Sequence, residues 1–265
     1  MNATFIYPLL REWGFSNGNM QVPSLLAKYP YSDKLFVDIG LGSDAQETIT
    51  ALKNDWICIS VEPSATNIKS ITHRLKNEKL YHKITILNCD IGSPGCVLSA
   101  GHSYLIHGAV GDTNRYVHTR GSGPMTQIST SGERVLSFSL EQIIPRWTKR
   151  VDFIKVDTQG FEGKVLSSID SLLDRVRVKY IMFEFSPWMM KQHSFGDPWG
   201  LLSRFPKMGA VCFDMMGQHN RLPRPDHLEN YYKRLNSGGN SQINRQTLLT
   251  DHVGPWEDIL CYFPD

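Results

Sequence analysis

Two apolar segments that each reach an aspartate, with glycine close behind, constrain the fold of this 265-residue chain more than any other feature. Residues 35–42 read Leu-Phe-Val-Asp-Ile-Gly-Leu-Gly, and residues 151–160 read Val-Asp-Phe-Ile-Lys-Val-Asp-Thr-Gln-Gly. Buried parallel strands have this composition, and their carboxyl ends form the ligand crevice of an open α/β sheet. The interval between the segments has room for several strand–helix units. The sequence therefore predicts a doubly wound sheet with both aspartates at one edge.

The rest of the chain continues this alternation of strands and helices. Strands are predicted at 34–40, 56–62, 103–110, 151–157, 179–185, 210–215 and 258–263. Residues 83–89 also read as a strand, but only one of 83–89 and 103–110 is expected to be the third core strand, and we favour the second. The predicted fold class is α/β, with a seven-stranded, mostly parallel sheet whose last strand is reversed.

Residues 34–265 are predicted to form a single domain, with a polar insertion at 217–256 before the last strand. Residues 1–33 are mixed in character and are expected to cover the sheet as an N-terminal cap or lid. Residues 113–133 are rich in Gly, Ser and Thr and are expected to form a loop or hairpin beside the substrate pocket. The insertion carries arginines interleaved with acids, so a solvated loop is favoured over a cap that binds an acidic substrate.

Composition excludes several classes of partner. Lysine and arginine number 28 against 26 aspartate and glutamate, and a net charge of +2 offers no strong field for nucleic acid. No uncharged stretch approaches the roughly 18 residues of a membrane span, and no cationic region precedes the apolar N-terminus. A cytoplasmic protein without a membrane partner is expected. The five cysteines are odd in number and contain no Cys-x-x-Cys, which favours thiols over disulfides or structural zinc.

The spacing of Asp38, Gly40, Gly42 and Glu62 indicates the kind of cofactor. The glycines allow close approach of the backbone to a ligand, and Glu62, at the end of the next strand, can accept hydrogen bonds from both hydroxyls of a ribose. A dinucleotide site shares these features, but Asp38 would oppose the pyrophosphate at the helix start. An ammonium and a sulfonium suit this carboxylate better. We therefore predict S-adenosylmethionine as the cofactor.

The order of these segments resembles the FkbM family of S-adenosylmethionine-dependent methyltransferases. The resemblance covers residues 35–187 and is carried by Phe36–Gly40, Val61–Pro63, Ala109–Asp112, Val151–Asp157 with Gly160 and Glu162, and Phe183–Glu184. It implies a class I methyltransferase (Rossmann-like) fold and O-methylation of sugars or natural products. The chain departs from the family pattern in the turn at 41–44, at His107 in place of an asparagine, and at Gln159 in place of a glutamate.

A set of residues at the strand ends and in the glycine turn is expected to bind the cofactor. These residues are Asp38, Gly40, Gly42, Glu62, Pro63, His107, Ala109 and Asp157.

Methyl transfer from a sulfonium is an in-line displacement, so the protein must align the acceptor, exclude water and take up a proton. The predicted catalytic residues are Asp157, Lys155 and His193. Asp157 and Glu184 could instead share Mg²⁺, which would lower the pKa of an acceptor hydroxyl. A further alternative is a structural ion pair between Lys155 and Glu184.

The sequence therefore predicts a methyltransferase that acts on a hydroxyl of a small molecule or glycan, and it leaves the oligomeric state open. One alternative is an NAD(P)-dependent oxidoreductase, which Asp38 and the absence of any Tyr-x-x-x-Lys disfavour. Another is a non-catalytic binding module on the same fold, suggested by the altered turn at 41–44.

Overall fold

The computed structural model describes residues 34–93, 96–112, 114–121, 123, 126–193, 195–214, 229–230, 232–233, 236 and 257–264. The predicted N-terminal cap at 1–33 lies outside these residues, as does most of the predicted insertion at 217–256. Within the insertion, Lys233 forms an ion pair with Glu229 at 2.7 Å.

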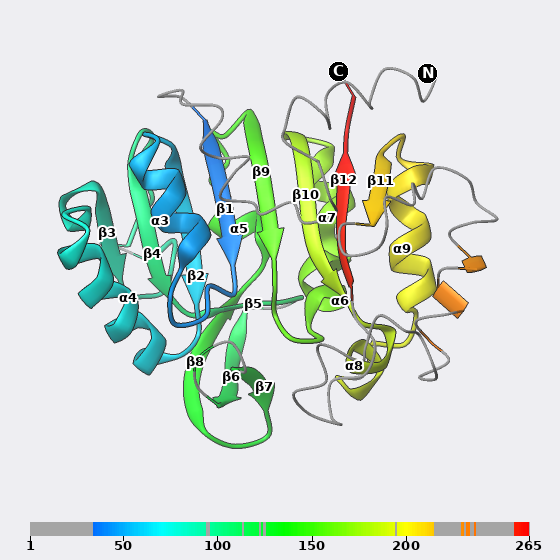
Figure 1. Cartoon of the computed structure of the whole chain (residues 1–265), viewed down its shortest axis with the longest axis horizontal. Coiled ribbons are helices and arrows are strands. Elements are labelled where there is room, and N and C mark those ends of the chain that lie inside the picture. The colour runs from blue at the N-terminus through cyan, green and yellow to red at the C-terminus, as the bar shows by residue number, and fades with distance from the viewer. Residues whose placement is uncertain are drawn as a thin grey trace.

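The core of the molecule is an eight-stranded sheet with the order β11-β12-β10-β9-β1-β2-β4-β3. Its strands are β1 (Leu35–Ile39), β2 (Ile57–Glu62), β3 (Ile84–Leu87), β4 (Ser103–His107), β9 (Arg150–Val156), β10 (Arg177–Phe185), β11 (Val211–Asp214) and β12 (Glu257–Tyr262). All neighbours pair in parallel except β12, which is antiparallel to both β10 and β11. The predicted fold class and the reversed last strand are confirmed (Figure 1).

The prediction of seven strands is wrong by one, because both candidates for the third strand belong to the sheet. Ile84–Leu87 pairs in parallel with Ser103–Ile106 and forms one edge. Only Ile84 of β3 is fully buried. Both segments have strand-like sequences, and only the pairing of β3 with β4 decides that the first also joins the sheet.

Helices cover both faces of the sheet. One face packs against α3 (Gln46–Lys53) and α4 (Ala65–Asn77), and the other packs against α5 (Leu140–Ile143), α6 (Glu162–Val165), α7 (Ile169–Leu173) and α9 (Pro198–Lys207). The described residues also form α8 (Pro187–Gln192) and two short 3-10 turns, η2 (Tyr81–Lys83) and η4 (Leu166–Ser168). In the described part of the chain no helix is long and apolar enough to cross a bilayer.

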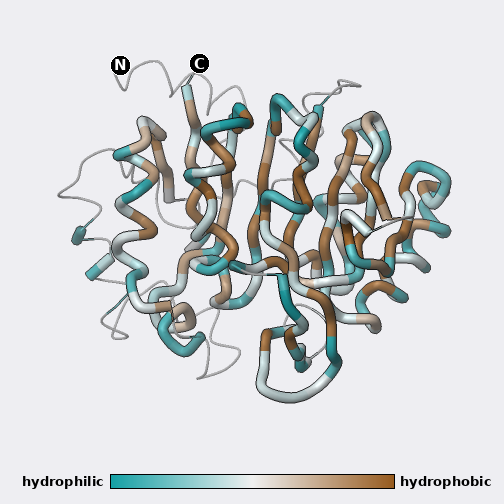
Figure 2. Tube along the Cα trace, turned by 180° about the vertical axis from the view of Figure 1, so that it is seen from behind, coloured by the Kyte–Doolittle hydropathy of each residue, from teal (hydrophilic) through white to brown (hydrophobic). Residues whose placement is uncertain are grey.

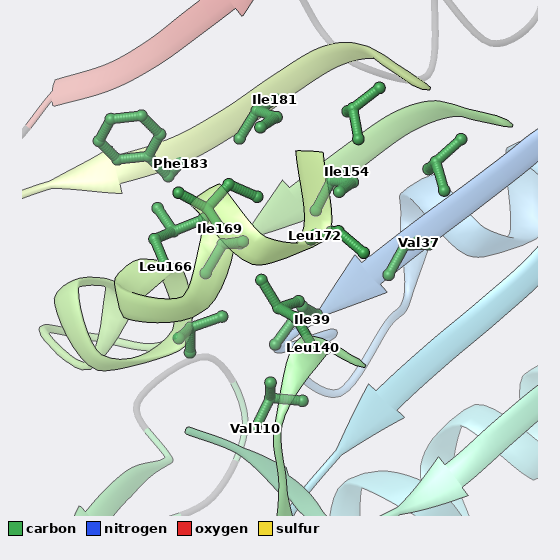
Figure 3. Packing of buried hydrophobic residues seen from close by; sticks show 14 of the residues in the cluster. Val37, Ile39, Val110, Leu140, Ile154, Leu166, Ile169, Leu172, Ile181 and Phe183 are labelled. Carbon is green, nitrogen blue, oxygen red and sulfur yellow. The ribbon is translucent and has the colours of Figure 1, made fainter. Parts of the chain in front are cut away.

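Alternation along the strands decides which side chains reach each face. Val37 and Ile39 of β1 pack with Ile154 and Leu140 on the α5–α7 side (Figure 3). Phe36 belongs to the α3–α4 side, and Asp38 shares its face because successive side chains of a strand alternate. Figure 2 shows that apolar residues predominate in the strands at the centre and polar residues in segments toward the periphery.

Helix α4 begins after a serine cap. The Ser64 hydroxyl accepts a hydrogen bond from the Asn67 amide at 3.3 Å, which satisfies one of the free N–H groups in the first turn. The Asp197 carboxylate caps α9 in the same way, through the Gly200 amide at 2.7 Å. These caps determine the residue at which each helix begins.

A second, four-stranded sheet extends from the carboxyl ends of the main strands (Figure 1). Its order is β5-β8-β6-β7, formed by β5 (Ala109–Val110), β6 (Arg115–Arg120), β7 (Gln127–Ser129) and β8 (Glu133–Phe138). β6 and β7 pair antiparallel, which confirms the hairpin predicted within 113–133. Its position brings residues of the hairpin beside the crevice of the main sheet.

The expectation of free thiols is wrong for four cysteines. Cys89 bonds to Cys96, and Cys212 of β11 bonds to Cys261 of β12, which leaves Cys58 as a buried thiol. The second pair is separated by 49 residues in sequence. Only the antiparallel pairing of β11 and β12 brings them opposite one another, so spacing along the chain gave no indication of it.

We predict that Gly40→Ala destabilises the fold severely. Gly40 has φ +82°, and a Cβ there would overlap the carbonyl oxygen of Asp157, where β1 and β9 end side by side. The expected loss is about 3 kcal/mol or more in urea unfolding, from backbone strain and overlap together. Gly209→Ala is the control, because its φ is +85° but no atom lies within 4 Å, so only about 1 kcal/mol is expected. Equal losses would contradict the account.

We also predict that iodoacetamide labels one cysteine per chain in denaturant without reductant, and five after reduction. The disulfides block Cys89, Cys96, Cys212 and Cys261, while denaturation exposes Cys58. Intact-mass spectrometry measures the number of labels. Five labels on the freshly purified, unreduced protein would show that the cysteines are thiols.

Candidate functional site

A pocket of about 340 Å³ opens at the carboxyl ends of β1, β2 and β9, beside the smaller sheet. Seven of the residues predicted for the site line it: Gly40, Gly42, Glu62, Pro63, Ala109, Lys155 and Asp157. Four others are absent from its wall: Asp38, His107, Glu184 and His193. The topology therefore brings the two halves recognised in the sequence to one place, but it does not bring every predicted side chain to the surface of the pocket.

The glycine turn after β1 forms one side of the pocket. Gly40 and Gly42 have φ values of +82° and +64°, in the left-handed region that glycine adopts without strain. Glu62 at the end of β2 holds the turn, because the backbone amides of Leu41 and Gly42 donate to its Oε2 at 3.1 and 3.2 Å.

Glu62 is the most enclosed of the lining carboxyls. Its Oε1 accepts from the Ser64 amide and from Asn67 Nδ2, each at 2.9 Å, in addition to the two amides at Oε2. These four donors occupy the acceptor capacity of a carboxylate. Burial raises the pKa of Glu62 to about 7, although all four hydrogen bonds act in the opposite direction. Binding of ribose hydroxyls at Glu62 stays a prediction, and it requires some of these bonds to be shared or displaced.

Asp38 lies behind the wall of the pocket. Its side chain is fully buried beneath α3, where Oδ2 accepts from the Thr48 hydroxyl at 2.7 Å. Thr48 also bonds to Ser60 at 2.8 Å. Oδ1 has no hydrogen-bond partner among the described residues, and burial raises the pKa of Asp38 to about 7. Strand alternation points this carboxyl into the helix layer, so its influence on a ligand would be electrostatic.

Lys155 neutralises the acids around it. It lies opposite Asp38 in the β1–β9 register, and its ammonium is 3.3 Å from Asp157 Oδ2 and 3.9 Å from Glu47 Oε1. Burial alone would lower the pKa of Lys155, but the carboxylates of Asp157, Asp38 and Glu47 outweigh it and raise that pKa. Lys155 thus forms ion pairs with Asp157 and Glu47, in place of the pair with Glu184 that was considered as an alternative.

A single amide nitrogen separates the two carboxyls that were predicted to share a metal. Gln159 Nε2 donates to Asp157 Oδ1 at 2.9 Å and to Glu184 Oε2 at 3.2 Å. N–H donors therefore occupy the position between the carboxylates where a cation would lie. No group of three or more potential metal ligands occurs within the described ranges, and the structure gives no support for Mg²⁺ at this site. Burial, with the negative charge of Asp157, raises the pKa of Glu184 well above its usual value.

His193 lies behind the loop that follows β9. Its ring packs edge-on against Phe161 with centroids 6.0 Å apart, and a Cβ on Gly160 would press against it. Burial and the nearby Lys164 lower the pKa of His193, which favours the neutral imidazole. Its position outside the pocket wall gives no support for direct contact with an acceptor. Its predicted catalytic role is untested.

His107 connects the end of β4 to the smaller sheet instead of entering the pocket. Its Nε2 lies 3.1 Å from the Pro63 carbonyl and 3.3 Å from Glu133 Oε1. Glu133 in turn accepts from the Ala65 amide at the start of α4. His107 therefore supports the backbone beside Pro63, and direct contact with the cofactor stays a prediction.

Sequence reasoning missed several residues of the site. The structure adds Glu47, Gln159 and the hairpin residues Gly123, Thr126 and Ile128 to the wall. Only the polar composition of 113–133 gave a signal for the hairpin, and it could not identify individual residues. Gln159 was recognised as a departure from the family pattern, but its φ of +54° and its two carboxylate partners come from the fold.

Comparison with solved structures found similar chains at low identity. The METTL16 MTase domain is 9% identical with a TM-score of 0.42, over 98% of this chain and 66% of that one. The O-methyltransferase TomG from Streptomyces achromogenes, solved with SAM, is 11% identical with a TM-score of 0.42, over 100% and 91%. The O-methyltransferase from Bacillus cereus, in complex with SAH, is 9% identical with a TM-score of 0.41, over 100% and 92%. No match was found among curated proteins.

The comparison with protein families gives the assignment. Residues 38–210 match the family described as Methyltransferase FkbM domain. This range is more than half of the chain and runs from β1 through α9, so it includes the glycine turn, Glu62, the hairpin and Asp157. The resemblance noted in the sequence is confirmed: the chain belongs to the FkbM family of S-adenosylmethionine-dependent methyltransferases.

Proposed function

We propose that the protein methylates a hydroxyl group of a small molecule or glycan, with Asp157 as the residue that receives or orients the acceptor proton. The observation that supports this proposal most directly is the position of Asp157. It lines the same pocket as the glycine turn and Glu62, and its side chain is 37% exposed. The family assignment favours methyl transfer over the nicotinamide chemistry and the non-catalytic module considered from the sequence.

The charges of the pocket fit S-adenosylmethionine. Asp44, Glu47, Glu62 and Asp157 line it, and Lys155 is the single lysine among the described residues of the wall. This excess of carboxyls suits a ligand that carries a sulfonium and an ammonium, and it disfavours a pyrophosphate. The backbone of the glycine turn would hold the methionine end, and Glu62 would hold the ribose. When bound, the cofactor supplies an electrophilic methyl group.

The residues of this chain would then do three things. The pocket wall aligns the acceptor oxygen with the methyl carbon, which contributes most to the rate in such a displacement. The hairpin residues Thr126 and Ile128 help to cover the pocket and exclude water. Lys155 and Gln159 hold Asp157 from two sides, so its carboxylate keeps one orientation while it takes the proton of the hydroxyl.

We predict that the protein binds S-adenosylhomocysteine and that Glu62→Ala weakens this binding at least about tenfold, since two ribose hydrogen bonds are lost. Asp38→Asn should have a smaller effect, because Asp38 is behind the wall and asparagine keeps the bond from Thr48. Isothermal titration calorimetry measures both. Glu78→Ala is the control, on the exposed end of α4. Binding of NAD(P) in place of S-adenosylhomocysteine would refute the proposal.

We predict that Asp157→Asn lowers turnover by about a hundredfold, because the asparagine amide cannot take up the proton. The affinity for S-adenosylhomocysteine should change less than about threefold. The assay is a screen of hydroxylated acceptors that follows S-adenosylhomocysteine release, run with and without chelator. Asp170→Asn on the exposed face of α7 is the control. Unchanged turnover of Asp157→Asn would show that the residue is not the base, and loss of activity with chelator would show that a metal takes part.

A further inference from the structure

One hydrogen-bond partner of the Glu62 carboxyl, the Asn67 side chain, also bonds to Gly123 and Thr126, more than 50 residues further along the chain. Asn67 is in the first turn of α4, is 1% exposed and points its amide between Glu62 and the hairpin loop. The described residues between β6 and β7, which are Gly121, Gly123 and Thr126, belong to the hairpin loop. We propose that Asn67 is a positioning residue of the cofactor site, which holds Glu62 and the hairpin loop in one fixed arrangement.

The contacts of the Asn67 amide are specific to this arrangement. Nδ2 donates to Glu62 Oε1 at 2.9 Å, to the Gly123 carbonyl at 3.0 Å and to Thr126 Oγ1 at 3.3 Å. Oδ1 accepts from the Gly123 amide at 2.9 Å. The side chain thus bonds to both backbone groups of Gly123, as a neighbouring strand would, while it also bonds to the carboxyl. A buried amide with all its groups paired has one stable orientation.

The hairpin loop also reaches the opposite side of the pocket. A Cβ placed on Gly123 would lie 3.9 Å from Ser43 Oγ, in the glycine turn after β1. Gly123, Thr126, Ser43 and Glu62 all line the pocket. The loop therefore spans from α4 to the glycine turn, and Asn67 is its anchor on the α4 side. Displacement of the loop would widen the pocket where the ribose is expected.

Among the four described donors to Glu62, Asn67 is the one side chain. The remaining three donors are backbone amides of Leu41, Gly42 and Ser64, which the glycine turn and the start of α4 fix in place. A ribose hydroxyl at Oε1 would therefore share this oxygen with the Asn67 amide. This links cofactor binding to the hairpin loop through one side chain. The inference rests on the proposed function, in which Glu62 holds the ribose.

The charges around this group decide how it should respond to pH. Burial raises the pKa of Glu62 to about 7, so the carboxyl is largely protonated at pH 6 and ionised at pH 8.5. The titratable groups on the elements around Glu62 are Asp44 of the glycine turn, His107 of β4 and Glu133 of β8, and the hydrogen bonds described for Glu62 come from none of them. An aspartate at position 67 would share a proton with Glu62 at pH 6 and repel it at pH 8.5.

The test compares Asn67→Ala and Asn67→Asp with wild type in titrations with S-adenosylhomocysteine at both pH values. Asn67→Ala should raise Kd about tenfold at either pH, because Glu62 and the loop lose their common partner. Asn67→Asp should raise Kd, relative to wild type, about tenfold at pH 8.5 but less than about threefold at pH 6. The same two substitutions at Asn77, exposed at the other end of α4, are the matched controls.

A second measurement needs no cofactor. Hydrogen–deuterium exchange of the ligand-free protein should show faster exchange in the peptide that contains Gly123 and Thr126 when Asn67 is alanine, and no change for Asn77→Ala. Gly123→Ala should loosen the same peptide from the loop side of these bonds while residue 67 stays asparagine, because φ at this position is +64°. This variant keeps the test valid if the substitutions at Asn67 prevent folding.

The outcomes separate the two proposals. Failure of the wild type to bind S-adenosylhomocysteine would overturn the proposed function, and the role of Asn67 in a cofactor site with it. Wild-type binding together with unaltered affinity and exchange in Asn67→Ala would overturn the inference alone. Unaltered affinity of Asn67→Asp at pH 8.5 would also contradict it, because two ionised carboxyls in the place of the 2.9 Å contact between Asn67 and Glu62 must repel one another.

Discussion

The site depends on the close contact between the ends of β1 and β9. Gly40 turns away from β1 directly against the Asp157 carbonyl, and the Asp157 amide donates to the Ile39 carbonyl at 2.8 Å. Only a residue without a side chain permits this approach. The contact brings the glycine turn, which is expected to hold the cofactor, to the same edge as the aspartate expected to act on the acceptor. The other walls of the pocket are arranged around this junction.

Three carboxyls beside the junction are buried, and burial disfavours their ionised forms. The hydrogen bonds that compensate for this burial differ from one carboxyl to the next. Asp38, Glu62 and Glu162 each have a pKa raised to about 7, with burial as the largest cause. Glu62 receives four hydrogen bonds, whereas Asp38 and Glu162 each keep one oxygen without a partner among the described residues. A cationic ligand nearby would favour the ionised forms of these groups. This acidic environment is consistent with the cofactor of the family.

The smaller sheet gives the pocket a boundary that the main sheet does not provide. Parallel strands end in loops, and here β5 to β8 turn one such connection into a structured wall. Val110 and Phe138 of this sheet pack in the main core, whereas its contacts with α4 are polar: Asn67 holds Gly123, and Glu133 bonds to the start of α4. Few apolar contacts are needed for an attachment of this kind, so the composition of 113–133 resembled that of a loop.

The sequence by itself determined the alternating strands and helices, the reversed last strand and the family. It also placed an acid and glycines at the correct strand ends, because local patterns and spacing record those features. Only the tertiary structure decided that Asp38 faces the helix layer, that Gln159 stands between Asp157 and Glu184, and that β3 joins the sheet. The physical reason is that the orientation and partners of a side chain depend on segments far away in the chain. Periodicity along one strand gives its faces, but it cannot supply the neighbours that those faces meet.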